Sequence, residues 1–453
     1  MKKYRFTSLF LSLLLVAAIL TPAAQAVTAP NITAGAALLM DAAHDEVLYE
    51  KNAHQKMYPA SLTKVMTALL VLEAIDNGQL TLDQMITASA TFSEGLSIYG
   101  SSQNIKAGEQ LSVRDLLYCL LVASANEAGN ILAEQVCGTT AAFVERMNLR
   151  ATELGCEGTH FVNAHGLHHA DHYTTAHDIY LIARAAMENE TFRTIVSTKR
   201  HEIPATNLSD QRVFYSTNAL LVTWHYVESY LYDKAIGIKT GTTDEAGNCL
   251  LSAAKDGDRY LISVILKADI VRTEGKPTDR RQFSESKTLL KWGFDSFRRV
   301  EVVDTHTPLA QVAVTLSKID HVLVRPANQL ECTLPVDADV EAIKQEITLT
   351  SDTVEAPVAE GQPLGTLTLT YGDKTLGTVD LIAVNEVERS VFLYRLTQIR
   401  EFFSKPIFKI LGLLLVLVLV ILVVRLFLKH PRRRYSSRRG GSYRRNYTGR
   451  RRR

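Results

Sequence analysis

Cysteine is scarce in this sequence, and the cysteines present show no ligand pattern. The 453 residues include five cysteines, with no CxxC spacing and no cysteine–histidine pattern of the kind that binds zinc. Because five is odd, at least one thiol is unpaired within the chain, and buried apolar thiols explain the cysteines as well as a disulfide does. No internal repeat of the solenoid type is present either. These absences argue against a cysteine-based metal site and a repeat architecture.

Acidic residues are absent from both ends of the chain. Residues 1–26 and 407–453 together hold 17 of the 50 lysines and arginines and none of the 48 acidic residues, so the stretch between them carries a net charge of −15. An acidic body argues against nucleic-acid binding. The composition is otherwise that of a globular protein, 46% hydrophobic and 22% charged, with room for two or three domains.

Residues 1–26 have the features of a secretory signal peptide. A basic start is followed by an apolar run from Leu9 to Leu20 and by the small-residue site Ala24-Gln25-Ala26, which predicts cleavage after Ala26. The alternative, a retained membrane anchor, is less favoured because the apolar run is too short for a hydrocarbon core of about 30 Å.

A second apolar run, near the other end, predicts a transmembrane helix over residues 407–428. Ile410 to Val424 is unbroken, and about 20 apolar residues span a bilayer. An amphipathic helix lying in the membrane plane would need a polar face, which this segment lacks. Residues 429–453 carry twelve cationic side chains, so the positive-inside rule places this tail in the cytoplasm and the acidic body outside. The alternative is an external tail that binds anionic wall polymers.

Periodicity between the two ends predicts an α+β fold. Strands are expected at both ends of a helical block, so that one antiparallel sheet packs on the helices. Short alternating segments after Val300 indicate a small all-β domain. The expected strands are 36–42, 46–51, 236–239, 248–254 and 260–266, and the expected helices are 62–75, 113–122, 127–137, 140–154, 175–187 and 280–292. The expected parts of the chain are an α+β domain at 27–299, a β-rich domain at 300–390, a linker at 391–406, the membrane helix at 407–428 and the basic tail.

The first chemical motif is Ser61-Leu62-Thr63-Lys64, at the start of a predicted helix. Serine and lysine three residues apart on a helix lie on one face, with Cβ atoms about 5–6 Å apart. The lysine amine can then take the proton of the serine hydroxyl, provided that burial or a neighbouring cation lowers its pKa. The positive end of the helix favours a developing oxyanion.

Two further motifs, Ser-x-Asn and Lys-Thr-Gly, follow the Ser-x-x-Lys motif along the chain. Ser124-Ala125-Asn126 ends a predicted helix, where the hydroxyl can relay a proton and the amide can orient the substrate or hold Lys64. Lys239-Thr240-Gly241 lies on a predicted strand whose edge can pair with an extended peptide. Lys239 and Thr240 suit a substrate carboxylate, and Gly241 allows a close backbone approach.

A single SxxK or SxN match carries little weight, because both arise by chance. Ser284-Glu285-Ser286-Lys287 is another SxxK, in the middle of a predicted helix, and we interpret it as solvated surface. Ser102-Gln103-Asn104 is another SxN, in a predicted loop. KTG occurs once, and the ordered set of three is the motif set of serine β-lactamases and penicillin-binding proteins.

At this level of detail the sequence resembles the low-molecular-mass penicillin-binding proteins that act as D-alanyl-D-alanine carboxypeptidases. The segments YPASLTKVMTALL, LLVASANEAGNILAE, FVNAHGLHHADHYTTAHDIYLIARAA and GIKTGTTDEAGNCLLSAA look like that family, in its order. The resemblance is close over residues 35–300 and looser over 300–390.

The resemblance implies a peptidase with a β-lactamase-like fold that removes the terminal D-Ala from peptidoglycan stem peptides ending in D-Ala-D-Ala, and that β-lactam antibiotics acylate. It implies Ser61 as nucleophile and Lys64 as base. Ser124 and Asn126 would be relay and orienting groups, and Lys239 a carboxylate ligand. Together with Ser61, Thr242 would supply the backbone N–H groups of an oxyanion hole. We expect no cofactor and no metal, because the family pattern places the five histidines of residues 165–177 in a structural loop and helix start.

Three departures and three alternatives accompany the resemblance. The family's SGN is SAN here, the proline before its HG is Ala164, and a full apolar span replaces the amphipathic anchor of some relatives. A class A β-lactamase would need a Glu-x-x-Leu-Asn loop, and the nearest segment, Glu145 to Leu149, has the wrong order. A catalytically silent wall-binding protein would lack Ser61 or Lys64. Transpeptidation, in which an amine replaces water, remains open.

Overall fold

The computed structural model describes residues 27–223 and 230–428. The expected signal peptide and the expected basic tail lie outside the described residues. Within them the chain forms two compact units. The first comprises residues up to 304 together with 329–345 and 368–377, and the second comprises 305–328, 346–367 and the residues from 378 onward.

A five-stranded antiparallel sheet organises the first unit, in the order β2-β1-β9-β8-β7. Its strands come from both sides of the helical block, as the sequence predicts. Strand β7 lies at one edge and pairs only with β8 among the described residues. The strands are β1 (Ala36–Asp41), β2 (Glu46–Lys51), β7 (Ala235–Thr243), β8 (Gly247–Asp256) and β9 (Arg259–Ala268).

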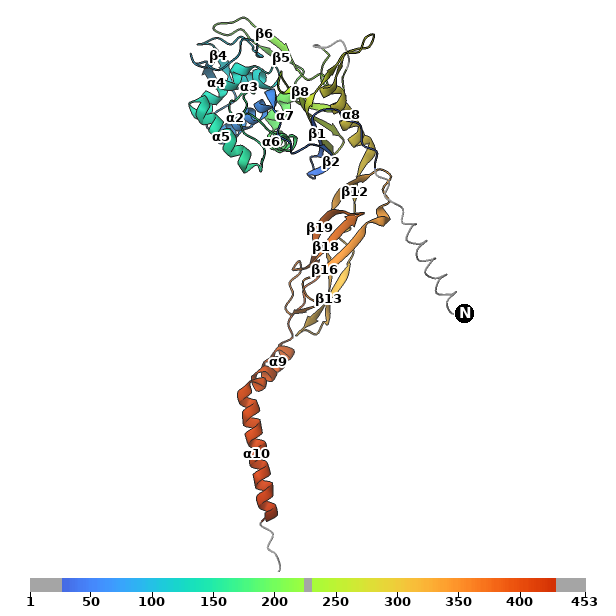
Figure 1. The fold of residues 1–453 in the computed structure, drawn as a ribbon. Coiled ribbons are helices and arrows are strands. Elements are labelled where there is room, and N and C mark those ends of the chain that lie inside the picture. The colour runs from blue at the N-terminus through green and yellow to red at the C-terminus, as the bar shows by residue number, and fades with distance from the viewer. Residues whose placement is uncertain (1–26, 224–229, 429–453) are drawn as a thin grey trace, which may run out of the picture. The chain divides into compact units, whose positions relative to one another are not determined.

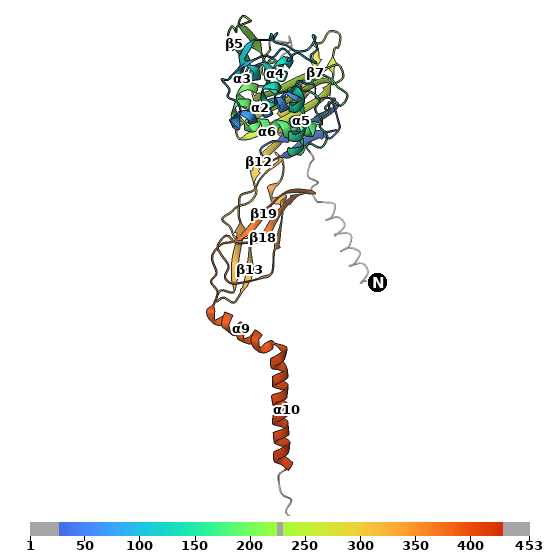
Figure 2. The same cartoon turned by 90° about the vertical axis from the view of Figure 1, so that its left-hand side faces the viewer.

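Helices cover the two faces of this sheet, because the sheet's apolar side chains alternate between two cores. Leu38 and Val264 join the core of the helical block, whereas Leu39 and Ile265 pack with α8 (Arg281–Ser296). Figure 1 shows α8 on one side of the sheet, and Figure 2 views the helical block on the other side. The block comprises α2 (Lys64–Asp76), α3 (Val113–Leu121), α4 (Asn126–Cys137), α5 (Thr140–Glu153), α6 (Ala176–Glu188) and α7 (Glu190–Val196).

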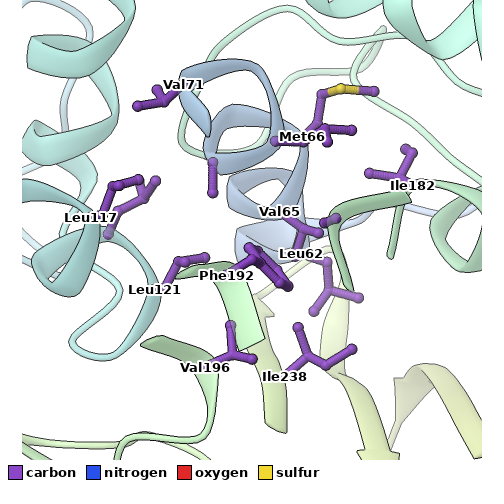
Figure 3. Close-up of a cluster of buried hydrophobic side chains, with 14 of the residues drawn as sticks. Leu62, Val65, Met66, Val71, Leu117, Leu121, Ile182, Phe192, Val196 and Ile238 are labelled. Atoms are coloured by element: carbon purple, nitrogen blue, oxygen red, sulfur yellow. The ribbon is translucent and has the colours of Figure 1, made fainter. Parts of the chain in front are cut away.

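The helical core fixes the start of α2 relative to β7. Leu62, in the turn just before α2, and Val65, in its first turn, are fully buried. Both lie beside Phe192 and Val196 of α7 and Ile238 of β7 (Figure 3). Burial of such side chains stabilises by about 1.5–3 kcal/mol each. The segment that carries Ser61 and the strand that carries Lys239 are therefore held by one apolar cluster.

A six-stranded sheet, in the order β16-β18-β19-β14-β13-β17, lies mostly in the second unit. Its strands are β13 (Ala310–Thr315), β14 (His321–Pro326), β16 (Lys344–Leu349), β17 (Thr353–Glu355), β18 (Pro363–Tyr371) and β19 (Lys374–Ala383). Two helices follow, α9 (Val391–Ser404) and α10 (Pro406–Leu428). Of the described helices, α10 is the one long and apolar enough to cross a membrane.

Four small two-stranded pairings complete the sheets. They join β3 (Met85–Thr87) to β4 (Gln110–Ser112), β5 (Arg200–Ile203) to β6 (Arg212–Tyr215), β10 (Ile270–Val271) to β11 (Asp279–Arg280), and β12 (Phe297–Glu301) to β15 (Glu331–Pro335). Neither these pairings nor α7 is predicted from the sequence.

The expected α+β fold is confirmed, but the interpretation of the second SxxK segment is wrong. Ser286 is fully buried and lies within hydrogen-bond distance of Ser252 and Ser263 on the sheet. The carboxylate of Glu285 is also buried and accepts hydrogen bonds from the backbone N–H groups of Thr33 and Ala34 at 2.8 and 3.1 Å. This helix face is polar because it packs on serines and on the N-terminal segment, not because it faces water.

Candidate active site

Ser61 lies in a short 3₁₀ turn, η1 (Ala60–Thr63), that runs directly into α2. Its neighbour Ala60 has a φ of 48°, a left-handed conformation that side chains other than glycine rarely adopt. Ser61 itself is half-buried, and the Nζ atom of Lys64 donates a hydrogen bond to its Oγ atom at 2.9 Å. The spacing thus brings the two groups into direct contact, as predicted.

Lys64 is fully buried, and three oxygen atoms surround its Nζ atom within hydrogen-bond distance. Besides Ser61, its Nζ atom donates to Asn126 Oδ1 at 2.7 Å and to the backbone oxygen of His165 at 2.6 Å. Burial lowers the pKa of Lys64 well below its usual range, the nearby charge of Lys239 lowers it further, and Glu127 opposes the shift. A buried lysine with a depressed pKa can act as a neutral amine near pH 7.

The second motif bridges two helices. The end of α3 at Leu121 and the start of α4 at Asn126 leave a short turn, in which Ser124 is buried with a φ of 65°. Asn126 is buried too, and its side chain supplies one of the three acceptors for Lys64. Of the two uses that the sequence leaves open for the amide, the structure supports holding Lys64.

The third motif lies on the sheet edge that faces Ser61. A Cβ atom at Gly241 would lie 3.0 Å from both the Pro59 oxygen and the Ser61 nitrogen, so this strand approaches the turn of Ser61 with its backbone. Thr242, the next residue, is exposed. The expected close approach at Gly241 is therefore present, and only glycine fits there without displacement.

Lys239 on the same strand is a second buried lysine. Burial lowers its pKa to about 7, and its Nζ atom donates to the backbone oxygen of Thr240 at 3.1 Å. The Thr240 Oγ1 atom shares a hydrogen bond of 2.6 Å with Thr217 Oγ1. An ammonium and two hydroxyls beside one strand edge offer donors to a carboxylate.

Sequence reasoning missed several contributors. Thr217 belongs to Ser216-Thr217-Asn218, a further SxN match that could have drawn attention, and Asn218 supports β7 by donating to the Gly237 oxygen at 3.0 Å. The backbone carbonyl of His165, which accepts a hydrogen bond from Lys64, could not be predicted, because every residue type has such a carbonyl. The glycine of the HG pair, Gly166, has a φ of 87°, and a Cβ atom there would collide with the Ala60 carbonyl.

The five histidines of residues 165–177 divide into two groups. His165 and His172 are buried, and burial lowers the pKa of each to about 3, so both imidazoles are neutral at physiological pH. The Nε2 atom of His172 lies within hydrogen-bond distance of Thr63 Oγ1, at 2.8 Å, and so contacts the last residue of η1. The other three, His168, His169 and His177, are not buried.

Comparison with known proteins decides the family. The family model described as D-alanyl-D-alanine carboxypeptidase matches residues 23–270, more than half of the chain. The chain belongs to this family. A second model, described as the C-terminal domain of penicillin-binding protein 5, matches residues 297–389.

Relatives of this carboxypeptidase-family chain are known from several bacteria. It is 32% identical over 380 residues to the D-alanyl-D-alanine carboxypeptidase DacC of Escherichia coli, covering 82% of this chain and 89% of that protein. It is 28% identical over 360 residues to DacF of Bacillus subtilis, covering 80% and 87%. The crystal structure of penicillin-binding protein 5 from Haemophilus influenzae superposes with a TM-score of 0.64 at 28% identity, covering 80% of this chain and all of that one.

These matches confirm the resemblance inferred from the motifs. The chain is a serine-type peptidase of peptidoglycan metabolism with the penicillin-binding-protein fold, a C-terminal all-β domain and one apolar C-terminal helix consistent with a membrane anchor.

Proposed function

We propose that Ser61 is the acyl-enzyme nucleophile of a D-alanyl-D-alanine carboxypeptidase and that Lys64 is its general base. The observation that carries this assignment is the contact of Lys64 Nζ with Ser61 Oγ inside a buried, fully hydrogen-bonded lysine site. As a neutral amine, Lys64 accepts the hydroxyl proton while Oγ attacks the carbonyl carbon of the penultimate D-Ala. The C–N bond then breaks, D-Ala leaves with that proton, and water hydrolyses the ester.

The oxyanion hole of this proposal consists of two backbone N–H groups, those of Ser61 and Thr242. The close approach of Gly241 to the Ser61 nitrogen supports it, because that approach brings the two backbones side by side. Donors fixed by backbone packing need no reorganisation as charge develops, and removing one such donor commonly costs about 10²–10³ in kcat.

Lys239, Thr240 and Gly241 form the proposed binding edge for the C-terminal carboxylate and backbone of the substrate. Lys239 supplies the charge, and the Thr240 hydroxyl a second donor, with Thr217 beside it. The anion stabilises the ammonium form of Lys239, so binding draws a proton onto this lysine. Ser124 is assigned the relay of the proton to the leaving amine, and Asn126 the positioning of Lys64.

The alternative function, that of a class A β-lactamase, would need a deacylating glutamate in a Glu-x-x-Leu-Asn loop. Glu145, the nearest candidate, is exposed and lies within the helix α5, so it does not support this alternative. Transpeptidation differs from hydrolysis only in the acceptor, so product analysis distinguishes it.

The membrane topology is part of the proposal. Residues 27–299 and 300–390 are assigned as catalytic and β-rich domains outside the cytoplasm, after removal of residues 1–26, and residues 407–428 span the membrane. The 23-residue apolar helix α10 supports the span. The residues assigned as a linker, 391–406, contain α9, and residues 429–453 form the cytoplasmic basic tail.

One experiment tests the chemistry. The full-length protein is incubated with penicillin, and separately with a diacyl-L-Lys-D-Ala-D-Ala peptide, and analysed by mass spectrometry. We expect a long-lived penicillin adduct on Ser61 and release of free D-Ala, both abolished in Ser61→Ala. A penicillin adduct that survives this substitution would refute the nucleophile assignment.

A further inference from the structure

A buried carboxylate, that of Glu127, lies beside the proposed catalytic group without touching Ser61. Glu127 follows Asn126 in the first turn of α4 and is 3% exposed. Burying an ionised carboxylate costs free energy unless hydrogen bonds and nearby positive charge compensate. Its place at a helix N-terminus offers such compensation, and so does the positive charge of Lys64 whenever that amine is protonated.

The carboxylate fastens a loop to this helix. Glu127 Oε1 accepts hydrogen bonds from Ser102 Oγ at 2.7 Å and from the Gln103 backbone N–H at 2.6 Å. Next to them, the Asn126 N–H donates to the Ser101 oxygen at 2.9 Å. Three hydrogen bonds therefore join residues 101–103 to the two residues that begin α4.

The same loop confines the Asn126 side chain. Gly100 packs against it so closely that a Cβ atom there would collide with Asn126 Nδ2. Asn126 also lines, with Glu127, a cavity of about 540 Å³ formed largely by residues 92–105 of this loop. The loop is thus a wall of the site. Its attachment to Glu127 therefore affects the position of the Asn126 side chain, whose amide contacts Lys64.

We propose that Glu127 is a positioning residue for the carboxypeptidase reaction: its carboxylate fastens residues 101–103 to the first turn of α4 and so holds Asn126 against the Nζ atom of Lys64. This inference rests on the proposed function of Lys64. Glu127 acts through Asn126 and through its charge, not by contact with the substrate.

The charge gives the proposal a signature that a purely structural residue would lack. Four ionisable groups interact electrostatically with Lys64. They are Glu127 of α4, Lys239 of β7, and His165 and His172 of the loop between α5 and α6. The pKa of each histidine is lowered to about 3, so both stay neutral in the assay range. Glu127 raises the pKa of Lys64 and Lys239 lowers it. Removing the negative charge therefore lowers the pKa of Lys64 further, and the acidic limb of the acylation profile moves to lower pH.

Two substitutions in the full-length protein separate geometry from charge. Glu127→Gln keeps a side-chain oxygen that can accept both hydrogen bonds but removes the charge. Glu127→Ala removes both. The matched control is Glu134→Gln on the same helix, whose carboxylate accepts a hydrogen bond from Ser89 Oγ at 2.6 Å in a similar attachment of a loop.

The measurements are the pH dependence of penicillin acylation, the kcat and KM of D-Ala release, and amide hydrogen exchange of residues 101–104. In Glu127→Gln we expect the acidic limb at lower pH, with KM nearly unchanged. In Glu127→Ala we expect faster exchange in residues 101–104 and a loss in kcat of roughly 10- to 100-fold, the range for one hydrogen bond to a charged group. Glu134→Gln should match the wild type in all three measurements.

An acidic limb of Glu127→Gln that coincides with that of the wild type overturns the proposal, as does unchanged hydrogen exchange in Glu127→Ala. A loss confined to thermal stability would show a structural role only. Failure of the proposed function looks different: the wild type itself would then form no Ser61 adduct, while the exchange comparison, which needs no activity, still reports whether Glu127 fastens the loop.

Discussion

Replacing Lys239 with methionine should stabilise the protein while removing carboxylate recognition. Lys239 is 1% exposed, and burial lowers its pKa from 10.5 to about 7. A lysine whose pKa is lower in the folded than in the unfolded state binds fewer protons when folded, so it destabilises the fold most below pH 7 and ceases to do so above pH 10.5.

The size of the effect follows from the two pKa values. Each pKa unit corresponds to about 1.4 kcal/mol, so the charge of Lys239 costs about 5 kcal/mol at pH 6 and about 2 kcal/mol at pH 9. Methionine fills a similar volume without charge. Lys239→Met should therefore be more stable than the wild type, by a margin that shrinks by about 3 kcal/mol from pH 6 to pH 9.

Unfolding of the full-length protein in detergent, at both pH values, measures this difference in free energy of unfolding. The unfolding transition of the catalytic unit is identified as the one whose midpoint changes when penicillin is bound. The same variant should lose most activity on substrates with a free carboxylate and much less on amidated ones. Removing the Lys239 charge should also move the acidic limb of acylation to higher pH, because Lys239 lowers the pKa of Lys64. A variant less stable than the wild type at pH 6, or a margin independent of pH, would refute the reasoning.

Three further outcomes are expected. Lys64→Ala should slow penicillin acylation at Ser61 by about 10²–10⁴ or more, measured by rapid-quench mass spectrometry, and near-normal labelling would place the base elsewhere. Gly241→Ala should lower kcat by about 10²–10³-fold with a smaller change in KM. The reason is that a Cβ atom 3.0 Å from the Ser61 nitrogen pushes the two proposed oxyanion donors apart. An unchanged kcat would contradict the proposed position of these donors. A tag after Arg453 should resist protease added to intact, wall-stripped cells while the body is released, and digestion of the tag would disprove the single-span topology.

Local patterns predicted the elements that carry the motifs, because each has a strong periodic or capping signal. The expected strand at 36–42 appears as β1 (Ala36–Asp41), and the expected helix at 113–122 as α3 (Val113–Leu121), capped by the Ser112 side chain, which accepts from the Asp115 N–H. Short elements were missed: α7 has only seven residues, too few for a clear helical period, and β5 and β6 are four residues each.

Contacts made by backbone groups could not be predicted from the sequence. The His165 oxygen that accepts from Lys64 belongs to a residue whose histidine side chain suggests other chemistry. The polarity of Glu285 and Ser286 suggests a solvated face, because their partners are distant in the sequence. Thr33 is 252 residues from Glu285, and Ser252 is 34 residues from Ser286. Periodicity reports which face of a helix is polar, not what that face contacts.

The position of Ser61 depends on backbone packing from two directions. Gly241 of the strand edge meets Pro59 and Ser61, and Gly166 of the loop after α5 meets the carbonyl of Ala60. Ala60, between them, is held in a left-handed conformation that an isolated chain would rarely adopt. Because both contacts need a residue without a side chain, the glycines of the KTG and HG segments serve the same turn although 75 residues separate them. The motifs that identify the family are thus, in part, the packing that holds its proposed nucleophile.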